Sequence, residues 1–379
     1  MDIPIIIKKK NLFSNKTSKS QVSKSQVSKS QVSKSQVSKS YSNLINNLLT
    51  SVKSETYVNI FGCDDEKKIL KMNQTNKNTI KVKIDKCMSN KTKKVKRILK
   101  SNLKKKVDCN NLMGPSQKLS NCWFNTLFVS FFLSDKGRKF TKYLRHLMIN
   151  GSKKDGTLIK PKSLRNSLFL LNMTIEACIN YEGVHNKIAK KINTNTIIKN
   201  IYNSIPKKDI DIYNVNEGGN PIDYYISIMN FLNYEKNSIK FIETTIDYNM
   251  LSNENKLYDI IIVSYYDNPT QYLLSCEDKK YDKIHITDRK GIKHKYVLDS
   301  TIVRDITGEH FSSTLMCNNK QLGYDGESTN RLNNEFKWKQ YINKDKNWTF
   351  EGSKWSNYKG NIYWNYKKSY SIFIYYRIN

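Results

Sequence analysis

Paired cysteines are missing from this chain. Its seven cysteines are odd in number and scattered, and none of them forms a Cys-x-x-Cys pair with another. Structural zinc sites and disulfide-stapled secreted domains both depend on close, regular cysteine spacings. The pattern indicates neither, so we expect reduced thiols, which fit an intracellular compartment best. The cysteines stand at positions 63, 87, 109, 122, 178, 276 and 317.

A secretory signal and a long apolar run are also lacking. The opening "MDIPIII" has an acid near its start and too short an apolar stretch for a signal peptide. The longest dense apolar stretch runs from Cys122 to Leu133, well short of the ~20 residues that a membrane span needs. We expect a soluble protein with no membrane span. Abundant Asn, Lys, Ile and Tyr are typical of an AT-rich genome, such as that of a large DNA virus or a protist. A viral protein would then act in the host cytoplasm or the virion, with the nucleus also open.

Acidic residues are few, and the charge is unevenly spread. The chain has 65 Lys and Arg against 33 Asp and Glu, for a net charge of +32. Residues 1–110 hold 26 basic and 7 acidic residues (+19), and residues 111–379 hold 39 and 26 (+13). Such a basic segment attracts nucleic acid, anionic membrane surfaces or acidic proteins without specificity. A solubilising tail is an equally good interpretation.

Low complexity marks the basic region. Four copies of "SQVSK" fill residues 20–39. A period of five matches neither a strand nor a helix, and one Val per copy gives no face to bury. A Lys-rich run follows at residues 91–106, with Val95, Ile98, Leu99 and Leu103 spaced for one helical face. We expect residues 1–110 to form a disordered basic tail, with a solvated helix or a nuclear-localisation or nucleic-acid-binding patch at 91–106.

Residues 111–379 are expected to form one folded domain. A helix should begin at "NCWF" with Ser120 or Asn121 as its N-cap, and Gly137 falls where a C-cap would end it. Further helices are predicted in "KFTKYLRHLMI", "SLRNSLFLLNMTIEACI" and "PIDYYISIMNFL". From Lys256 onward the pattern favours strands, in "LYDIIIVSYY", "KYVLDSTIVR", "HFSSTLMC", "KQLGYD" and "YSIFIYYRI". Helices first and strands second predict an α+β fold.

Cys122 raises the question of chemistry. A cysteine at a helix start is either a small buried hydrophobe or a nucleophile whose thiolate the helix end favours. A nucleophile needs a histidine, and the histidine needs a group to orient it. Of the five histidines, His310 opens a predicted strand after a Gly-containing turn. Asp325 follows the next strand, and a hairpin at "NNK" would return it to His310. Asp299 and Asp305 are rivals for that third position. The other histidines are His146, His185, His285 and His294.

Three stretches resemble the ubiquitin-specific protease family of the papain-like superfamily. The first, "QKLSNCWFNTL", resembles the cysteine box of that family. The second, around "GEHF" and "GYD", resembles its histidine box, and "SYSIFIYYRI" resembles its last strand. The matching residues are Gln117, Cys122, Trp123, Asn125, Thr126, Leu127, Gly308, His310, Phe311, Tyr324, Asp325, Tyr370, Tyr375 and Arg377.

The resemblance implies a fold and an activity. The fold would have a helical N-terminal lobe whose central cysteine-bearing helix packs on an antiparallel sheet. The activity would be thiol-dependent cleavage after the C-terminal glycine of ubiquitin or a ubiquitin-like protein, with no cofactor or metal. Cys122 would be the nucleophile, His310 the general base and Asp325 the group that orients it. Gln117 would donate to the oxyanion in place of the more usual Asn.

The chain also departs from the family. The family's paired-cysteine zinc fingers have no counterpart in this chain, and Glu309 replaces the glycine that usually precedes the histidine. Trp338, Trp348, Trp355 and Trp364 lie in a stretch that does not match the family, and we interpret them as core packing. The substrate tail is basic and family clefts are usually acidic, whereas this domain is itself basic. Candidate acids for the cleft are Glu243, Asp247, Asp267, Glu277 and Asp278.

Two alternatives stay open from the residues alone. The chain could be a virion structural or nucleic-acid-associated protein whose protease-like domain is an inactive binding module. The basic tail favours this alternative, and the intact Cys, His and Asp set argues against it. A cysteine acyltransferase would use the same residues, so sequence does not separate it from a peptidase.

Overall fold

The structure is a computed structural model of the whole chain. The residues that it describes are 5–7, 69–73, 79–83, 96–97, 99–117, 119–179, 194–206, 213–215, 217, 220–234, 239–243, 257–265, 282–328, 331–333, 336–353 and 362–378. The SQVSK repeats lie outside them.

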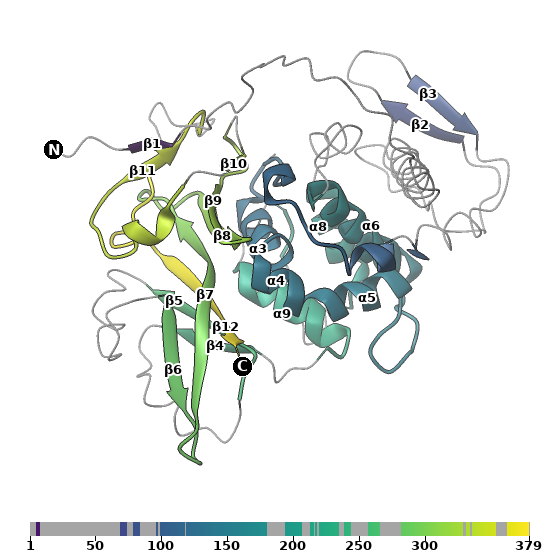
Figure 1. Cartoon of the computed structure of the whole chain (residues 1–379). Coiled ribbons are helices and arrows are strands. Elements are labelled where there is room, and N and C mark those ends of the chain that lie inside the picture. Colours follow the sequence, from purple (N-terminus) through teal and green to yellow (C-terminus); the bar gives the residue numbers. More distant parts are fainter. Residues whose placement is uncertain are drawn as a thin grey trace, which may run out of the picture.

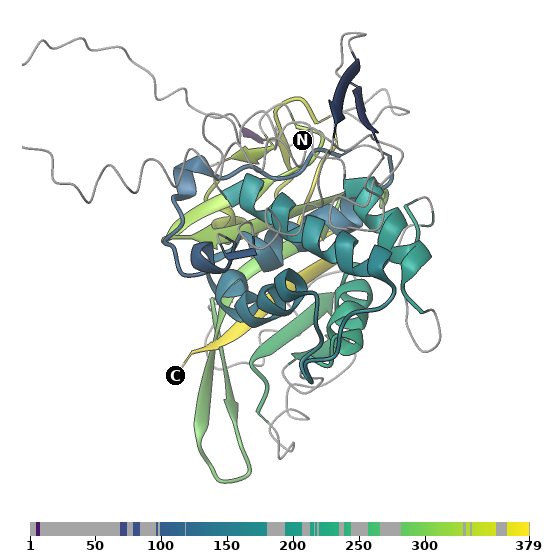
Figure 2. The same cartoon turned by 90° about the vertical axis from the view of Figure 1, so that its right-hand side faces the viewer.

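A large sheet forms the centre of the described part. Its strands run in the order β10-β9-β8-β7-β12-β5-β4, and β6 pairs with an extension of β7. The pairs are antiparallel except β4 with β5, which is parallel and departs from the expected antiparallel lobe. The bounds are β4 (Ile239–Glu243), β5 (Ile260–Tyr265), β6 (Lys283–Thr287), β7 (Lys293–Arg304), β8 (Phe311–Cys317), β9 (Lys320–Tyr324), β10 (Leu332–Asn333) and β12 (Ser371–Ile378). Figure 2 shows the β6–β7 hairpin projecting beyond the rest of the sheet.

Both faces of the sheet are buried, which explains the continuous apolar runs of its central strands. In β12, Ile372 and Ile374 contact one core cluster, and Phe373 and Tyr375 contact the other. Successive side chains of a strand point to opposite faces, so this alternation is what a two-sided sheet requires. The strand β12 lies between β7 and β5 and joins the two halves of the sheet.

Helices cover one face of the sheet (Figure 1). Their bounds are α3 (Cys122–Phe132), α4 (Asp135–Phe140), α5 (Lys142–Asn150), α6 (Lys162–Ile179), α8 (Thr194–Ser204) and α9 (Pro221–Phe231). The order of helices and strands is the α+β arrangement that the sequence predicts, although α8 had not been anticipated. The central helix α3 contacts β7, β8, α4 and α9, and each of its eleven residues is buried.

The ends of α3 differ from expectation. Asn121 is the N-cap by position, but its side chain makes no capping hydrogen bond. The prediction that Gly137 caps the C-terminus is wrong, because α3 ends at Phe132 and Gly137 lies inside α4. A Cβ on Gly137 would come within 2.5 Å of the Ser130 carbonyl oxygen. Glycine is therefore needed here because α4 approaches the end of α3 closely. It does not end a helix.

Aromatic side chains cover the opposite face. The 3-10 helix η2 (Trp338–Tyr341) and the strand β11 (Trp348–Phe350) carry much of this layer. Trp338, Trp348 and Trp364 are fully buried in it. Trp348 stacks on Trp364 with ring centroids 5.2 Å apart. The packing interpretation is confirmed for these three, and Trp355 lies outside the described residues.

Parts of the region expected to be a disordered tail have structure. β1 (Ile5–Ile7) pairs in parallel with β11, and β2 (Ile69–Asn73) pairs with β3 (Thr79–Lys83). Helical residues at 96–97 and 99–102 follow, and Leu99 is fully buried in the core of the domain. Short Ile- and Val-rich runs have the β propensity that the averaged composition concealed. The core thus includes residues before the predicted boundary at 111.

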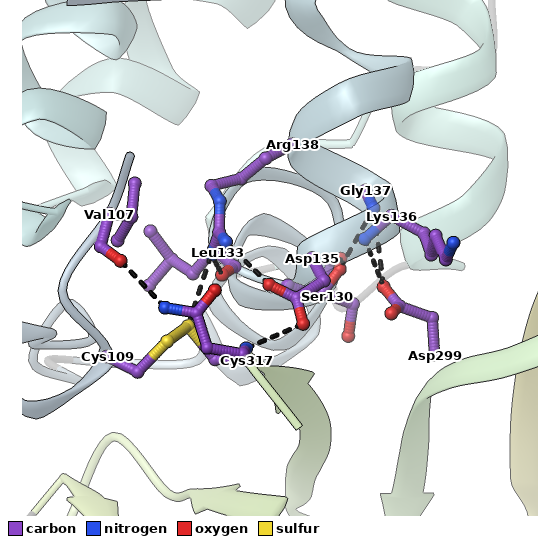
Figure 3. A network of polar contacts seen from close by, with 12 residues as sticks. Val107, Cys109, Ser130, Leu133, Asp135, Lys136, Gly137, Arg138, Asp299 and Cys317 are labelled. Atoms are coloured by element: carbon purple, nitrogen blue, oxygen red, sulfur yellow. Dashed lines mark hydrogen bonds and ion pairs between the residues drawn. A yellow bond between two sulfur atoms is a disulfide. The ribbon is translucent and has the colours of Figure 1, made fainter. Parts of the chain in front are cut away.

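A disulfide joins two distant segments, contrary to the expectation of reduced thiols. Cys109, in the 3-10 helix η1 (Cys109–Asn111), is bonded to Cys317 at the end of β8. The two cysteines are 208 residues apart, so no spacing rule could pair them. Beside the bond, Asn318 donates to Asp135 through its backbone N–H (2.7 Å) and to the Val107 carbonyl through its amide (3.0 Å), as Figure 3 shows.

The same region ties the sheet to the helices through Asp299. This residue is the extra one at a bulge where the register of β7 on β12 shifts. Its carboxylate accepts hydrogen bonds from the backbone N–H groups of Lys136 (3.0 Å) and Gly137 (3.3 Å) at the start of α4 (Figure 3). A bulge re-aims a side chain, and here it aims a carboxylate at unpaired helix N–H groups. Burial raises the pKa of Asp299 to about 6.

No helix among the described residues is long and apolar enough to cross a bilayer.

The disulfide should stabilise the domain. We expect the double variant Cys109→Ala, Cys317→Ala to lose about 3 kcal/mol of unfolding free energy, because the bond closes a very long loop in the unfolded chain. Denaturant unfolding without reductant measures this loss. Cys178→Ala is the matched control, since it removes a buried thiol that is not bonded. If alkylation of the denatured, unreduced protein modifies both Cys109 and Cys317, the bond is absent and the assignment is wrong.

Asp299 should make stability depend on pH. Its pKa is about 6 in the folded protein against an ordinary value of 3.8, so the folded state holds the proton more tightly. Its contribution is complete below about pH 4 and is lost as the pH rises through 6, by up to about 3 kcal/mol. Asp299→Asn should flatten this part of the stability profile, measured by denaturant unfolding from pH 4 to 7. Equal slopes in both proteins would contradict the prediction.

Candidate active site

Cys122 is the first residue of α3, directly after Asn121. The first N–H groups of a helix have no partner within it, and together with the helix dipole they favour a negative charge at that end. The first turn holds no acidic residue that would oppose such a charge. The Cys122 side chain is mostly buried, with 6% of its surface exposed. A thiolate at this position would have a fixed location and access from one side.

His310 is held by a turn that Asp305 organises. The Asp305 carboxylate accepts hydrogen bonds from the backbone N–H groups of Glu309 and His310, both at 2.7 Å. It also accepts from the backbone and the hydroxyl of Thr307. Gly308 has φ +83° within this turn, a conformation that favours glycine. The turn fixes the backbone just before β8 and so places the imidazole.

The β8–β9 hairpin brings Asp325 back to His310. In its register Ser313 faces Tyr324 across the two strands. His310 precedes β8 and Asp325 follows β9, so the two residues meet at the open end of the hairpin. His310 Nε2 lies 2.8 Å from Asp325 Oδ1, and both side chains are almost completely buried, at 1% and 0% exposed. The predicted return of the chain at "NNK" is confirmed.

Charge sets the protonation of this pair. Burial alone would lower the pKa of His310, but the Asp325 carboxylate and the Cys122 side chain outweigh it. Together they hold the pKa of His310 well above its ordinary value. An imidazolium is thus stabilised between a carboxylate and a thiol. Because Nε2 contacts Asp325, Nδ1 is the ring nitrogen left for the thiol.

Asp325 is itself held in place by neighbours that sequence reasoning missed. Ser353 Oγ donates to its Oδ2, and the Glu327 N–H donates to its Oδ1 at 3.1 Å. Its own N–H donates to the Arg331 carbonyl at 3.0 Å. Ser353 lies 28 residues further along the chain, and no local motif marks it. The fixed carboxylate keeps the imidazole in one orientation.

The rival carboxylates have other roles in the fold. Asp305 binds the backbone of the turn before His310 and does not bind the imidazole ring. Asp299 caps the start of α4. Of the three candidates, only Asp325 forms a hydrogen bond to the ring of His310 among the described contacts.

Gln117 lies against the turn that follows Asp325. Its backbone N–H donates to the Gly326 carbonyl at 2.9 Å. A Cβ on Gly326 would come within 2.9 Å of Gln117 Cβ, so glycine is needed for this approach. Two further bonds hold the preceding segment. The Tyr324 hydroxyl donates to the Pro115 carbonyl (2.6 Å), and Arg331 donates to the Gly114 carbonyl (3.2 Å).

The side chain of Gln117 has one oxygen without a partner. Its Oε1 is buried and has no hydrogen-bond partner among the described residues. A buried amide oxygen without a donor costs free energy, which favours a donor supplied by a ligand. An oxyanion would instead accept from the N–H groups of the same amide, so the role predicted for Gln117 stays a prediction.

A buried hydroxyl from α8 supports the start of α3. Thr194 Oγ1 accepts from Asn121 Nδ2 at 2.8 Å and donates to Asn125 Oδ1 at 2.7 Å. Asn125 Nδ2 in turn lies 3.4 Å from the Ser116 carbonyl. The network joins the residues on both sides of Cys122 to the segment that carries Gln117. No sequence signal pointed to Thr194, because α8 was not predicted.

The other described histidines do not contribute to this site. His146 lies in α5 beside Tyr143, and His294 contacts Asp288 in the β6–β7 turn at 3.0 Å. His285 lies on β6, and His185 is outside the described residues. The candidate cleft acids Asp247, Asp267, Glu277 and Asp278 are outside them as well. Glu243 lies on β4, but its side chain is not described.

The arrangement can perform nucleophilic chemistry. It combines a thiol at a helix N-terminus, a buried imidazole with a raised pKa and a carboxylate bonded to the distal ring nitrogen. Such a set activates a cysteine for attack on a carbonyl carbon. Within the described residues, no group of three or more His, Cys, Asp or Glu is placed to hold a metal ion.

Comparison with known proteins gives little further guidance. No protein-family model matches the chain, and no curated protein matches it. Among solved structures, the chain is similar to one described as the structure of the SAGA Ubp8/Sgf11/Sus1/Sgf73 DUB module. The two are 9% identical, the match covers 92% of this chain and 98% of that chain, and the TM-score is 0.41. A likeness at this level does not establish a function.

The Thr194 network should matter to the site. Thr194→Val removes the hydroxyl and leaves Asn125 Oδ1 buried without its donor, so we expect a loss of about 2 kcal/mol of unfolding free energy. The alkylation rate of Cys122 should also change, because the start of α3 loses its anchor. Thr194→Ser keeps the hydroxyl and is the matched control. A Val variant as stable as the Ser variant would show that the network contributes nothing.

Proposed function

We propose that this chain is a cysteine peptidase with a ubiquitin-specific-protease-like fold and a catalytic set of Cys122, His310, Asp325 and Gln117. One observation carries the proposal. His310 and Asp325, chosen from the sequence, form a buried hydrogen-bonded pair of 2.8 Å whose imidazole also interacts with the Cys122 side chain. A buried imidazole and carboxylate next to a helix-end thiol have no evident value for stability, because burying charged groups is costly.

The first half of the reaction uses the thiol. The Cys122 thiolate attacks the carbonyl carbon of the scissile amide, and the imidazolium of His310 holds the proton that the thiol gave up. The tetrahedral intermediate then breaks its C–N bond, and His310 transfers its proton to the departing nitrogen. The acyl group stays on sulfur as a thioester.

The second half uses water. Neutral His310 takes a proton from a water molecule, which attacks the thioester carbon. The C–S bond breaks, the acid product leaves, and the thiolate returns beside an imidazolium. Asp325 does not take up the proton in this scheme. It fixes the ring so that Nδ1 faces the sulfur, and it stabilises the positive charge.

The oxyanion needs donors. We assign this role to the Gln117 amide and the Cys122 backbone N–H. The side-chain amide supplies one N–H, and the helix start supplies a second. Gln is one methylene longer than the family's Asn. The close contact of Gln117 Cβ with Gly326, which admits no Cβ, fixes where that longer side chain starts.

For the substrate we propose the C-terminal glycine of ubiquitin or a ubiquitin-like protein, joined to an amine. This proposal rests on the three motifs that resemble the family and on their order along the chain. A glycine at the cleavage point suits a nucleophile that is 6% exposed, because no side chain next to the carbonyl has to enter the narrow approach.

The proposal predicts covalent labelling. Ubiquitin with a thiol-reactive group at its C-terminus should form an adduct with Cys122, read as a mass increase and mapped by peptide sequencing. Cys122→Ala should abolish both the adduct and any peptidase activity. His310→Ala should lower the labelling rate at least about a hundredfold, because the thiol loses its base.

The other described free cysteine provides the control. Cys178 is fully buried, and burial raises the pKa of its thiol to about 12, so Cys178→Ala should label as the wild type does. An adduct that survives Cys122→Ala would refute the nucleophile assignment. A folded protein that no ubiquitin-like probe labels would reject the substrate and favour an inactive binding domain.

A further inference from the structure

Glu327 carries a feature that the proposed reaction does not use. The side chain is half-buried, and its Oε2 is enclosed and has no hydrogen-bond partner among the described residues. Its backbone N–H donates to Asp325 Oδ1 at 3.1 Å, so the residue is attached directly to the proposed catalytic pair. Leaving a carboxylate oxygen buried and unpaired costs more than leaving a neutral acceptor so. A protein retains such an oxygen where a ligand supplies the missing donor.

The position of the carboxylate indicates which part of a substrate it would meet. Burial raises the pKa of Glu327, the charge on His310 opposes that rise, and the charge on Asp325 adds to it. After burial, His310 is its strongest electrostatic partner. In the proposed reaction, the imidazolium delivers its proton to the nitrogen that departs. The backbone N–H of Glu327 binds Asp325 Oδ1, and the same oxygen binds the imidazole. The side chain of Glu327 therefore starts on the His310 side of the site, where the leaving nitrogen departs, whereas the oxyanion is assigned to Gln117 and the Cys122 N–H.

We propose that Glu327 is a specificity-determining residue that accepts a hydrogen bond from the nitrogen of the leaving group, so that the site favours alkyl amine leaving groups such as the ε-nitrogen of lysine. The inference rests on the proposed function. As the C–N bond breaks, the nitrogen keeps the electron pair and takes the proton from His310 Nδ1, and the acyl carbon stays on Cys122 sulfur. The nitrogen then carries two N–H groups in place of one, and its partial positive charge pairs with the carboxylate.

An ester of the same acyl group tests this assignment. Its leaving oxygen brings no N–H to Glu327 in the ground state and little positive charge on departure. Two substrates would be compared, with ubiquitin joined through its C-terminal glycine either to the ε-nitrogen of a lysine peptide or to the hydroxyl of a serine peptide. We expect Glu327→Gln to lower kcat/KM for the lysine conjugate about tenfold or more, in line with a lost charge-assisted hydrogen bond. The value for the ester should change less than about twofold, well below the tenfold that one such bond is worth.

Two controls separate this role from a general one. Glu309→Gln removes the same charge from an exposed side chain one residue from His310 and should leave the ratio of the two kcat/KM values unchanged. Labelling by the ubiquitin electrophile involves no leaving amine, so Glu327→Gln should change the labelling rate no more than it changes kcat/KM for the ester, and the adduct also shows that the variant is folded.

The outcomes are distinct. Equal losses of kcat/KM on both substrates would mean that Glu327 supports the His310–Asp325 pair, and would overturn the leaving-group role. No loss on either substrate would overturn that role as well. If kcat/KM instead falls when an arginine on the acyl side is replaced by neutral citrulline, the carboxylate interacts with the acyl side of the substrate. That result would also overturn the leaving-group role. A wild type that is neither labelled nor active on either substrate would reject the proposed function itself, and this inference with it.

Discussion

The hydrogen bond between His310 and Asp325 is the interaction on which the rest of the site depends. It exists because one tight hairpin places the residue before β8 and the residue after β9 side by side. Two ionisable side chains without solvent would be unstable alone. Asp305 fixes the backbone on one side, and Ser353 satisfies the second carboxylate oxygen on the other. Burial then becomes an advantage, since in a dry site the carboxylate acts strongly on the ring.

Two layers on opposite faces of the sheet hold the side chains of the site in place. The helical layer delivers Cys122 at the start of a fully buried helix, and the aromatic layer supports the sheet from behind. Trp364 belongs to that aromatic layer, and its ring lies 5.8 Å from the ring of His310. One of the tryptophans that match no motif thus packs beside the histidine, and Trp348 stacks on it in turn. Their bulk and rigidity hold a side chain whose orientation must not drift.

Much of this could be predicted, and the failures have physical reasons. The strands β5, β7, β8, β9 and β12 and most of the helices follow from apolar periodicity, and the link between His310 and Asp325 follows from one hairpin. The disulfide could not be predicted, because Cys109 and Cys317 are 208 residues apart and only the fold makes them neighbours. The sequence alone does not distinguish Gly137, which close packing requires, from a glycine that ends a helix. The contacts of Thr194 and Ser353 exist only in three dimensions.

The place of β12 has a consequence for how the molecule is made. This strand, at residues 371–378, lies in the middle of the sheet between β7 and β5. During synthesis the strands on either side of it emerge first and have no means of joining. The halves can close only when this late segment threads between them. Cys122 emerges from the ribosome before that segment, but at that point its helix has no finished sheet to pack on. Until residues 371–378 pair with both β5 and β7, the sheet behind the helix of Cys122 is incomplete.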